Sequence, residues 1–126
     1  MRSYPSALNP DVVVVLPEGR LDALASPALE NALVALESQG AKQVVLNLRE
    51  TSYVSSSGLR VILIHTRRLR QAGGDLRLCC LVDKVVRVMR VAGFDAVLDI
   101  LADEDLAVQA FQKPKKMEIG TEEKKT

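Results

Sequence analysis

Three consecutive serines, Ser55, Ser56 and Ser57, precede Gly58 at a point where the predicted structure changes. The run "KQVVLNL" before them has the continuous apolar character of a buried strand, and "GLRVILIHTRRLRQ" has the spacing of an amphipathic helix. Free backbone N–H groups and the positive end of the helix dipole meet at a helix N-terminus and favour a phosphate there. Serine is also a common helix-capping residue. The residues alone therefore leave two roles open, helix capping and acceptance of a phosphoryl group.

A catalytic role for these serines lacks the partners that it requires. The nucleophile elbow of α/β-hydrolases has the pattern G-x-S-x-G, and Val54 occupies the first glycine position when Ser56 is the nucleophile. The single histidine, His65, would lie ~12 Å along the predicted helix from Ser57, beyond hydrogen-bond reach. The sequence contains no S-x-x-K pattern, no phosphate-binding glycine motif and no cluster at metal-ligand spacing. We therefore expect a protein that is not an enzyme and needs no cofactor or metal.

Composition restricts the class of protein further. The 126 residues fit one domain, and 48% hydrophobic residues are enough for a folded core. Aromatic residues make up only 3%, which leaves few rings for base stacking, and the net charge is +1. The basic stretch "HTRRLRQ" therefore fits the solvated face of a helix, and we expect no nucleic-acid partner. No window reaches the ~20 apolar residues of a membrane span and no secretory signal is apparent, so we expect a cytoplasmic protein.

Cys79 and Cys80 are adjacent within a predicted strand. Neighbouring residues on a strand point to opposite faces, which makes a disulfide between them geometrically poor. We therefore expect two small apolar core residues in a reducing compartment.

Hydrophobic patterns predict strands that alternate with helices. The expected strands are 12–16, 42–48, 75–82 and 96–101, and the expected helices are 26–40, 58–72, 84–92 and about 104–111. Candidate N-caps of three helices are Ser26, Asp83 and Asp103. This alternation predicts parallel strand pairing in an α/β domain, with a candidate edge strand before Val12. The charged segment 113–126 is short of large apolar side chains, so we expect a domain at 1–112 and a disordered tail.

Three segments in this order, "GRLDALASPALENAL", "VVLNLRETSYVSSSGLRVIL" and "QAGGDLRLCCLVDKVVRVMRVAGFDAVLDI", resemble the bacterial anti-sigma factor antagonists. These proteins are single-domain members of the STAS family. The resemblance covers about residues 10–111. It implies a single STAS domain with a central, mainly parallel, mixed β-sheet and helices packed against it.

The resemblance also implies a phosphorylation site. The family turn reads Asp-Ser-Ser-Gly or Asp-Ser-Thr-Gly, and Gly58 sets the register here. Ser56 then takes the phosphoacceptor position, Ser57 the second hydroxyl position, and Ser55 the position of the family Asp. We expect Ser56 near the N-cap of the helix, Ser55 in the incoming turn, and Ser57 pointing along the helix.

The mechanism implied by the resemblance is a partner switch. The unmodified protein would bind an anti-sigma factor that is also a serine kinase of the histidine-kinase-like ATPase class. Phosphorylation would release it, and a serine phosphatase would reset it. The implied partner-binding residues are Asp22, Leu59 and Arg60, although Asp22 could equally cap the following helix. The alternative is a non-phosphorylated structural STAS subunit of a larger signalling or lipid-transport assembly, and Ser55 in place of Asp favours it.

Removal of residues 114–126 should leave the thermal midpoint of unfolding nearly unchanged, because "PKKMEIGTEEKKT" has no apolar periodicity with which to dock on a core. Differential scanning calorimetry of the truncated and full chains measures this. A loss of several degrees in the truncated chain would show that the segment contributes to the stability of the folded domain.

Overall fold

The computed structural model describes residues 1–112, and the tail predicted at 113–126 lies outside the described residues. The strands are β1 (Arg2–Pro5), β2 (Val12–Leu16), β3 (Gly19–Leu21), β4 (Gln43–Asn47), β5 (Thr51–Val54), β6 (Asp75–Cys79) and β7 (Asp99–Leu101). The helices are α1 (Ser26–Ser38), α2 (Ser56–Gln71), α3 (Asp83–Val91) and α4 (Glu104–Gln109), with short 3-10 turns at Phe94–Ala96 and Ala110–Gln112. Within this part of the chain, no helix has the length and apolar character needed to cross a membrane.

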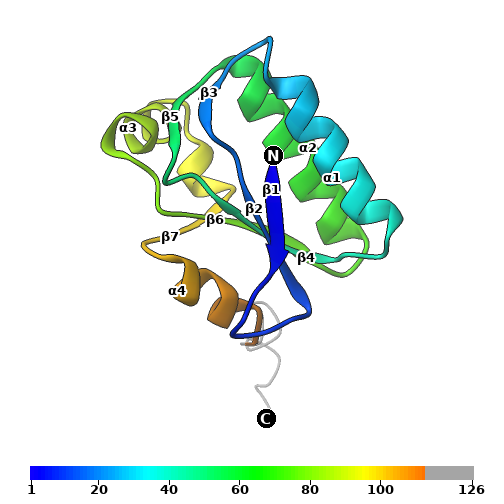
Figure 1. Ribbon diagram of the computed structural model, residues 1–126. Helices are drawn as coiled ribbons and strands as arrows, with labels where there is room; N and C mark the ends of the chain where they lie inside the picture. Colours follow the sequence, from blue (N-terminus) through cyan, green and yellow to red (C-terminus); the bar gives the residue numbers. More distant parts are fainter. Residues whose placement is uncertain (113–126) are drawn as a thin grey trace.

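A five-stranded sheet forms the centre of the domain, in the order β1-β2-β4-β6-β7 (Figure 1). β1 runs antiparallel to β2, whereas the neighbours β2–β4, β4–β6 and β6–β7 are parallel. Val45 of β4 pairs with Val14 on one side and with Arg77 on the other. The predicted mixed, mainly parallel sheet is therefore confirmed, and the candidate strand before Val12 is its antiparallel edge.

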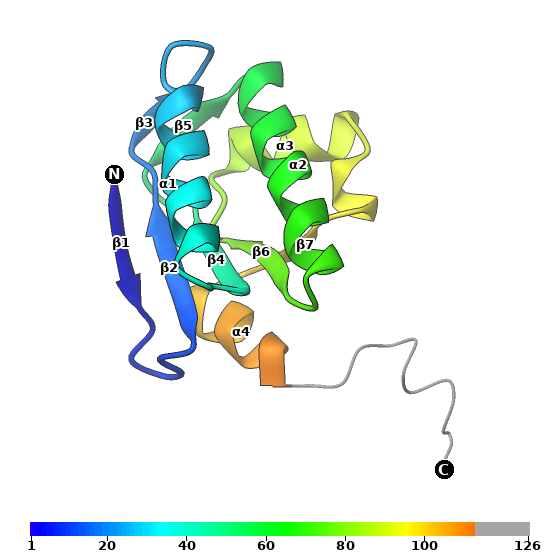
Figure 2. The same cartoon turned by 90° about the vertical axis from the view of Figure 1, so that its right-hand side faces the viewer.

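Helices cover the two faces of this sheet differently (Figures 1 and 2). α1 and α2 pack side by side on one face, and the larger cluster of buried side chains lies beneath them and α3, with Leu33, Ile62 and Met89 among its members. α4 lies on the other face, over a smaller cluster that includes Val14 and Val108. This layering of helices on both faces of a parallel sheet confirms the α/β class.

A second, two-stranded sheet is formed by β3 and β5, which pair in parallel with a register shift after Gly19. Neither strand was predicted from the sequence. With three and four residues, β3 and β5 are too short to show alternation, and they pair with a segment about thirty residues away. This small sheet brings two segments together, because β3 ends just before the α1 loop and β5 ends just before α2.

Several predicted element ends also differ from the structure. β6 ends at Cys79 rather than at 82, and only Asp99–Leu101 of the predicted last strand is extended. The predicted cap at Asp83 is wrong by one residue, because Val82 is the N-cap of α3 and Asp83 is its first helical residue.

A buried histidine joins α1 to α2. His65 is 1% exposed, and its ring nitrogens Nδ1 and Nε2 lie within hydrogen-bond distance of Glu37 and Glu30. Both carboxylates accept a hydrogen bond only when both ring nitrogens carry protons, since neutral imidazole has one N–H. Arg68 Nε donates to Glu37 at 2.8 Å. These contacts hold α1 against α2 and give His65 a structural role.

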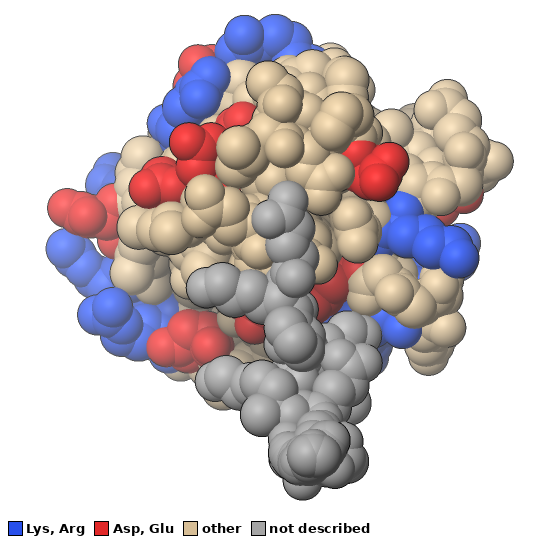
Figure 3. Space-filling view, turned by 90° about the horizontal axis from the view of Figure 1, so that it is seen from below, with Lys and Arg blue, Asp and Glu red and all other residues tan. Residues whose placement is uncertain are grey.

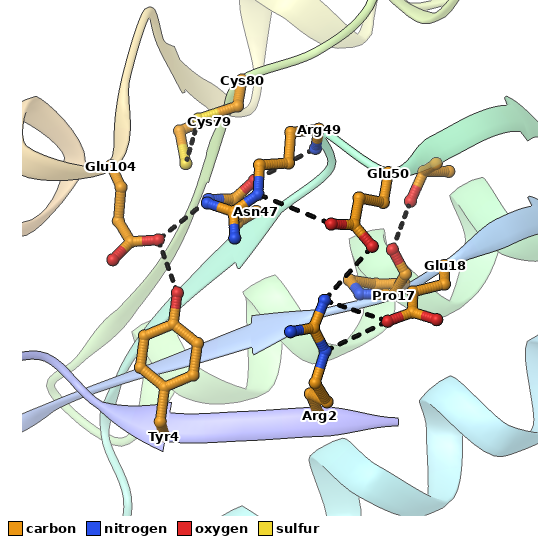
Figure 4. Close-up of polar contacts among 11 residues, drawn as sticks. Arg2, Tyr4, Pro17, Glu18, Asn47, Arg49, Glu50, Cys79, Cys80 and Glu104 are labelled. Atoms are coloured by element: carbon orange, nitrogen blue, oxygen red, sulfur yellow. Dashed lines mark hydrogen bonds and ion pairs between the residues drawn. The ribbon is translucent and has the colours of Figure 1, made fainter.

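The Glu104 carboxylate joins α4 to the sheet, and Asp103 caps the start of the helix. Asp103 caps α4, as predicted, by accepting a hydrogen bond from the Leu106 N–H at 2.8 Å. Glu104 Oε1 then accepts hydrogen bonds from the Tyr4 hydroxyl of β1 and the Asn47 amide of β4, each at 2.8 Å (Figure 4). Burial, together with the hydrogen bond to Glu104, raises the pKa of Tyr4 to about 12. Glu104 therefore links α4 to both β1 and β4.

The basic stretch of α2 is partly neutralised by the fold. Arg68 pairs with Glu37, and Arg70 Nε lies 2.8 Å from Asp75 Oδ1. On the described part of the face seen from below, acidic and basic side chains lie among one another (Figure 3). Arg67, Arg68 and Arg70 are exposed, which agrees with the expectation that they form a solvated helix face.

Replacement of Glu37 by Gln should lower the free energy of unfolding by about 2 kcal/mol at neutral pH, because it weakens charge-assisted hydrogen bonds from His65 and Arg68. Burial acts to raise the pKa of Glu37, but the hydrogen bonds and charges of His65 and Arg68 outweigh it and hold the pKa below its ordinary value. A depressed folded-state pKa stabilises the fold above the unfolded-state pKa, and this stabilisation is lost as the pH falls through the folded-state pKa.

The difference in unfolding free energy between the wild type and Glu37→Gln should therefore be present above pH ~5 and shrink towards zero below pH ~3. Urea denaturation at a series of pH values measures it. Glu30→Gln is the control, because the Glu30 side chain is 43% exposed and should show a smaller difference. A Glu37 effect that stays constant down to the lowest pH would contradict this account.

Candidate functional site

Ser55 ties the first turn of α2 to the end of β3. Ser55 is the N-cap, and its Oγ accepts a hydrogen bond from the Gly58 N–H at 3.2 Å. The same hydroxyl donates to the Leu21 carbonyl at 3.1 Å, and the Ser55 N–H donates to that carbonyl at 2.9 Å. Ser56 lies next to the cap and is exposed, as predicted, whereas Ser55, expected to finish the incoming turn, is itself the cap. The capping role belongs to Ser55.

The start of α2 lies so close to β3 that position 58 requires glycine. A Cβ on Gly58 would lie 2.8 Å from the Leu21 carbonyl oxygen and 3.1 Å from Val54 Cγ1. Any larger residue would push the helix start away from β3, because a packed backbone cannot yield that space without moving. The glycine that sets the sequence register therefore has a packing role here.

Ser56 is the first residue of α2 and is exposed, whereas Ser57 is half-buried. N–H groups in the first turn of a helix lack intrahelical partners, and the helix dipole places positive charge there. α2 has 16 residues and no acidic residue in its first turn. A negative group on Ser56 would therefore meet a favourable local field.

Asp22 organises the loop that leads from β3 into α1. Its Oδ1 accepts a hydrogen bond from the Ala25 N–H at 3.0 Å, and its carbonyl accepts from the N–H and hydroxyl of Ser26 at 2.8 and 2.6 Å. Ala25 is the N-cap and Ser26 the first helical residue, so the predicted cap at Ser26 is wrong. The helix-capping alternative for Asp22 is wrong, because α1 has no side-chain hydrogen bond at its N-cap and Asp22 instead closes the turn that precedes the helix. Its other oxygen, Oδ2, lies 3.8 Å from Arg20 Nε in a half-exposed position.

The two other predicted partner contacts differ in exposure. Leu59 is 8% exposed and belongs to the main core, so its contribution is to position α2. Arg60 is exposed and follows Ser56 by four residues, which places the two side chains on the same face of α2.

Two surface features at the end of the molecule where α2 begins were not predicted from the sequence. Leu24, in the loop that Asp22 organises, is 91% exposed. An open groove of about 350 Å³ lies between the first turns of α1 and α2, and Pro27, Ser57 and Arg60 are among its lining residues. A loop leucine produces no periodic signal, and the groove depends on the packing of two helices that are distant in sequence. The groove places Pro27 and Arg60 beside Ser57, the residue that follows Ser56.

Among the described residues, no group of three or more His, Cys, Asp or Glu side chains is placed to hold a metal ion. The arrangement around Ser56 offers an exposed hydroxyl, a helix N-terminus and an exposed loop. Such a surface can bind another protein and can carry a phosphoryl group.

The STAS domain model matches residues 5–107 of the chain. The chain belongs to the STAS domain family. The chain is 35% identical over 95 residues to BtrV of Bordetella bronchiseptica, a protein named as an anti-sigma factor antagonist, and the match covers 75% of this chain and 82% of BtrV. It is 32% identical over 91 residues to an anti-sigma-B factor antagonist of Bacillus subtilis, covering 72% and 83% of the two chains.

Solved structures share the fold of this STAS domain. A Thermotoga maritima protein described as an anti-sigma factor antagonist superposes with a TM-score of 0.77 at 21% identity, over 82% of this chain and 89% of that one. The anti-sigma factor antagonist SpoIIAA in its unphosphorylated form gives a TM-score of 0.63 at 22% identity, over 82% and 92%. These likenesses confirm the predicted STAS architecture.

Because Ser55 and not Ser56 caps α2, we expect alanine substitutions at these two serines to change the free energy of unfolding by different amounts. Ser55→Ala should lower the free energy of unfolding by about 1 kcal/mol, because the Gly58 N–H and the Leu21 carbonyl each lose a hydrogen bond. Ser56→Ala should change it by less than about 0.5 kcal/mol, because the exposed Ser56 is not the cap. Chemical denaturation of the two variants compares them directly. Equal losses, or a larger loss for Ser56→Ala, would contradict the assignment.

Proposed function

We propose that this protein is an anti-sigma factor antagonist that works by binding and not by catalysis, and that phosphorylation of Ser56 ends the binding. The observation that carries the proposal is the division of roles between two serines. The Ser55 hydroxyl is engaged in capping, whereas Ser56 is exposed at the start of a 16-residue helix. The names of the B. bronchiseptica and B. subtilis relatives support this function.

The proposed binding surface is the end of the molecule where the α1 loop and the start of α2 meet, opposite α4 (Figure 1). Leu24 is the apolar anchor of this surface, because its side chain is almost fully exposed and would be desolvated in a complex. Asp22 contributes its second carboxylate oxygen, and Arg60 contributes a cation beside the groove. Leu59 and Gly58 act indirectly, since they hold α2 in place beneath the surface.

The proposed partner is an anti-sigma factor that is also a serine kinase of the histidine-kinase-like ATPase class. Phosphorylation adds about −1.5 to −2 charges at pH 7. Within a desolvated interface, a charge without a partner is costly, so the complex is weakened. Arg60, four residues further along α2, is placed to pair with a phosphate on Ser56 and would then be withdrawn from the partner. A serine phosphatase would restore the binding form, and the whole cycle belongs in the cytoplasm.

Ser55 in place of the family Asp fits this proposal. Serine and aspartate both accept a hydrogen bond from the first turn and are comparable N-caps. Serine also donates to the Leu21 carbonyl, which a carboxylate cannot do. The substitution therefore keeps the cap, gains a donor and removes one negative charge beside the phosphoacceptor, where a carboxylate would repel the phosphate.

A structural STAS subunit that is never phosphorylated is the second candidate, and the missing acidic residue at position 55 is what favours it. The purified protein, incubated with ATP and the anti-sigma factor kinase of its own organism, should carry phosphate on Ser56 by mass spectrometry. Ser56→Ala should abolish the modification and retain binding, whereas Ser56→Asp should weaken binding. Phosphate on Ser57 would shift the register by one residue. Phosphate on none of the three serines, with tight binding retained, would favour the structural subunit.

Leu24→Ser should weaken binding of the anti-sigma factor about tenfold or more, because loss of a buried leucine anchor costs roughly 1.5–3 kcal/mol. The thermal midpoint should stay unchanged, since Leu24 is 91% exposed in the free protein. Leu106→Ser is the matched control, because Leu106 is also an exposed leucine and lies on α4 at the other end of the molecule. Isothermal titration calorimetry compares the three proteins. Equal losses of affinity in both variants would remove Leu24 from the proposed surface.

A further inference from the structure

The sequence predicts that the two adjacent cysteines point to opposite faces of a strand. This prediction is wrong. β6 ends at Cys79, and Cys80 adopts a positive φ of 64°. It is the one non-glycine residue with positive φ among those that the structure describes. This turn brings the two sulfur atoms within 3.3 Å of each other, on the same side of the chain (Figure 4).

The conformation of Cys80 is informative because it is unfavourable for a residue with a side chain. Left-handed backbone conformations crowd Cβ against the backbone, and non-glycine residues that hold them concentrate at functional sites. An extended Cys80 would have continued the strand and separated the two thiols. The local backbone therefore holds the thiols together at an energetic cost.

The two thiols have different surroundings. Cys79 is fully buried and packs in the smaller core cluster with Ala107 and Val108 of α4. Burial, together with the contact to Cys80, raises the pKa of the Cys79 thiol, which keeps it protonated. Cys80 is partly exposed at the edge of the same cluster. An oxidant that arrives from solvent therefore meets Cys80 first, with Cys79 directly behind it.

We propose that Cys79 and Cys80 form a redox modification site, a vicinal dithiol that closes reversibly to a disulfide on reaction with a hydroperoxide. The Cys80 thiolate attacks one oxygen of the peroxide, the O–O bond breaks, and Cys80 becomes a sulfenic acid as water leaves. The Cys79 sulfur then attacks the Cys80 sulfur, loses its proton, and displaces the hydroxyl group as a second water. In sum, two thiols and one hydrogen peroxide give one disulfide and two waters, with two electrons passing from sulfur to oxygen.

The ability to form a disulfide between Cys79 and Cys80 distinguishes this site from two separate core cysteines. A sulfenic acid with no thiol in reach would persist or oxidise further to the sulfinic acid. With the second sulfur 3.3 Å away, Cys79 is within reach of a sulfenic acid on Cys80. The disulfide that forms is strained, because adjacent Cα atoms lie closer together than those of ordinary disulfides, and this strain makes it easy to reduce again. The proposal does not depend on the proposed phosphorylation of Ser56.

The test is intact-mass spectrometry of the purified, fully reduced chain after treatment with a small molar excess of hydrogen peroxide. The expected product is a monomer that has lost the mass of two hydrogens, and dithiothreitol should return it to the starting mass. Peptide mapping should show that neither cysteine is alkylated by iodoacetamide until the reductant is added. Stable addition of oxygen to Cys80 without ring closure, disulfide-linked dimers in place of the monomeric product, or no reaction would overturn the proposal.

Cys80→Ser is the matched variant, because it keeps the side-chain size at the partly exposed position and leaves the buried Cys79 intact. It should fold, and it should give no peroxide product that has lost two hydrogens. The wild-type test needs no variant, so misfolding of Cys80→Ser would leave the main result decisive. A monomeric product lacking two hydrogens in Cys80→Ser would show that the wild-type mass change has another origin, and would contradict the assignment.

Discussion

The carbonyl oxygen of Leu21 is the contact on which the rest of the site depends. It accepts two hydrogen bonds from Ser55, one from the backbone N–H and one from the hydroxyl, and it lies where a Cβ on Gly58 would collide. This junction holds the end of β3 against the start of α2. The next residue, Asp22, then builds the loop into α1. Two helix starts, separated by thirty residues of sequence, are thereby brought to one end of the domain, and Ser56 is exposed at the second of them.

The remaining contacts serve to make this end rigid. His65 links α1 to α2 through Glu30 and Glu37, so the two helices that carry the surface cannot move independently without breaking these hydrogen bonds. Glu104 fastens α4 to β1 and β4 on the opposite face, at a distance from the site. A preorganised surface of this kind lets a single added charge act on a partner, because little of the effect is absorbed by rearrangement of the domain.

The sequence was sufficient for the class of fold, because the buried strands Val12–Leu16 and Gln43–Asn47 and the four helices carry strong hydrophobic periodicity. It was insufficient wherever long-range contacts decide the local structure. β3 and β5 exist only because they pair with each other, and the cap at Ser55 is selected by a carbonyl from β3. The exposure of Leu24, the salt bridges of His65 and the left-handed Cys80 likewise follow from packing, which no local pattern encodes.

Phosphorylation of Ser56 is proposed to control binding while the fold stays intact. The most direct measurement is calorimetric titration of the anti-sigma factor with two proteins, the unmodified chain and a chain into which phosphoserine is incorporated at position 56 during translation. The account predicts that the phosphoserine protein binds at least ~100-fold more weakly, with an unchanged circular dichroism spectrum and thermal midpoint. Equal affinity of the two proteins, or a loss of affinity that accompanies unfolding, would contradict it.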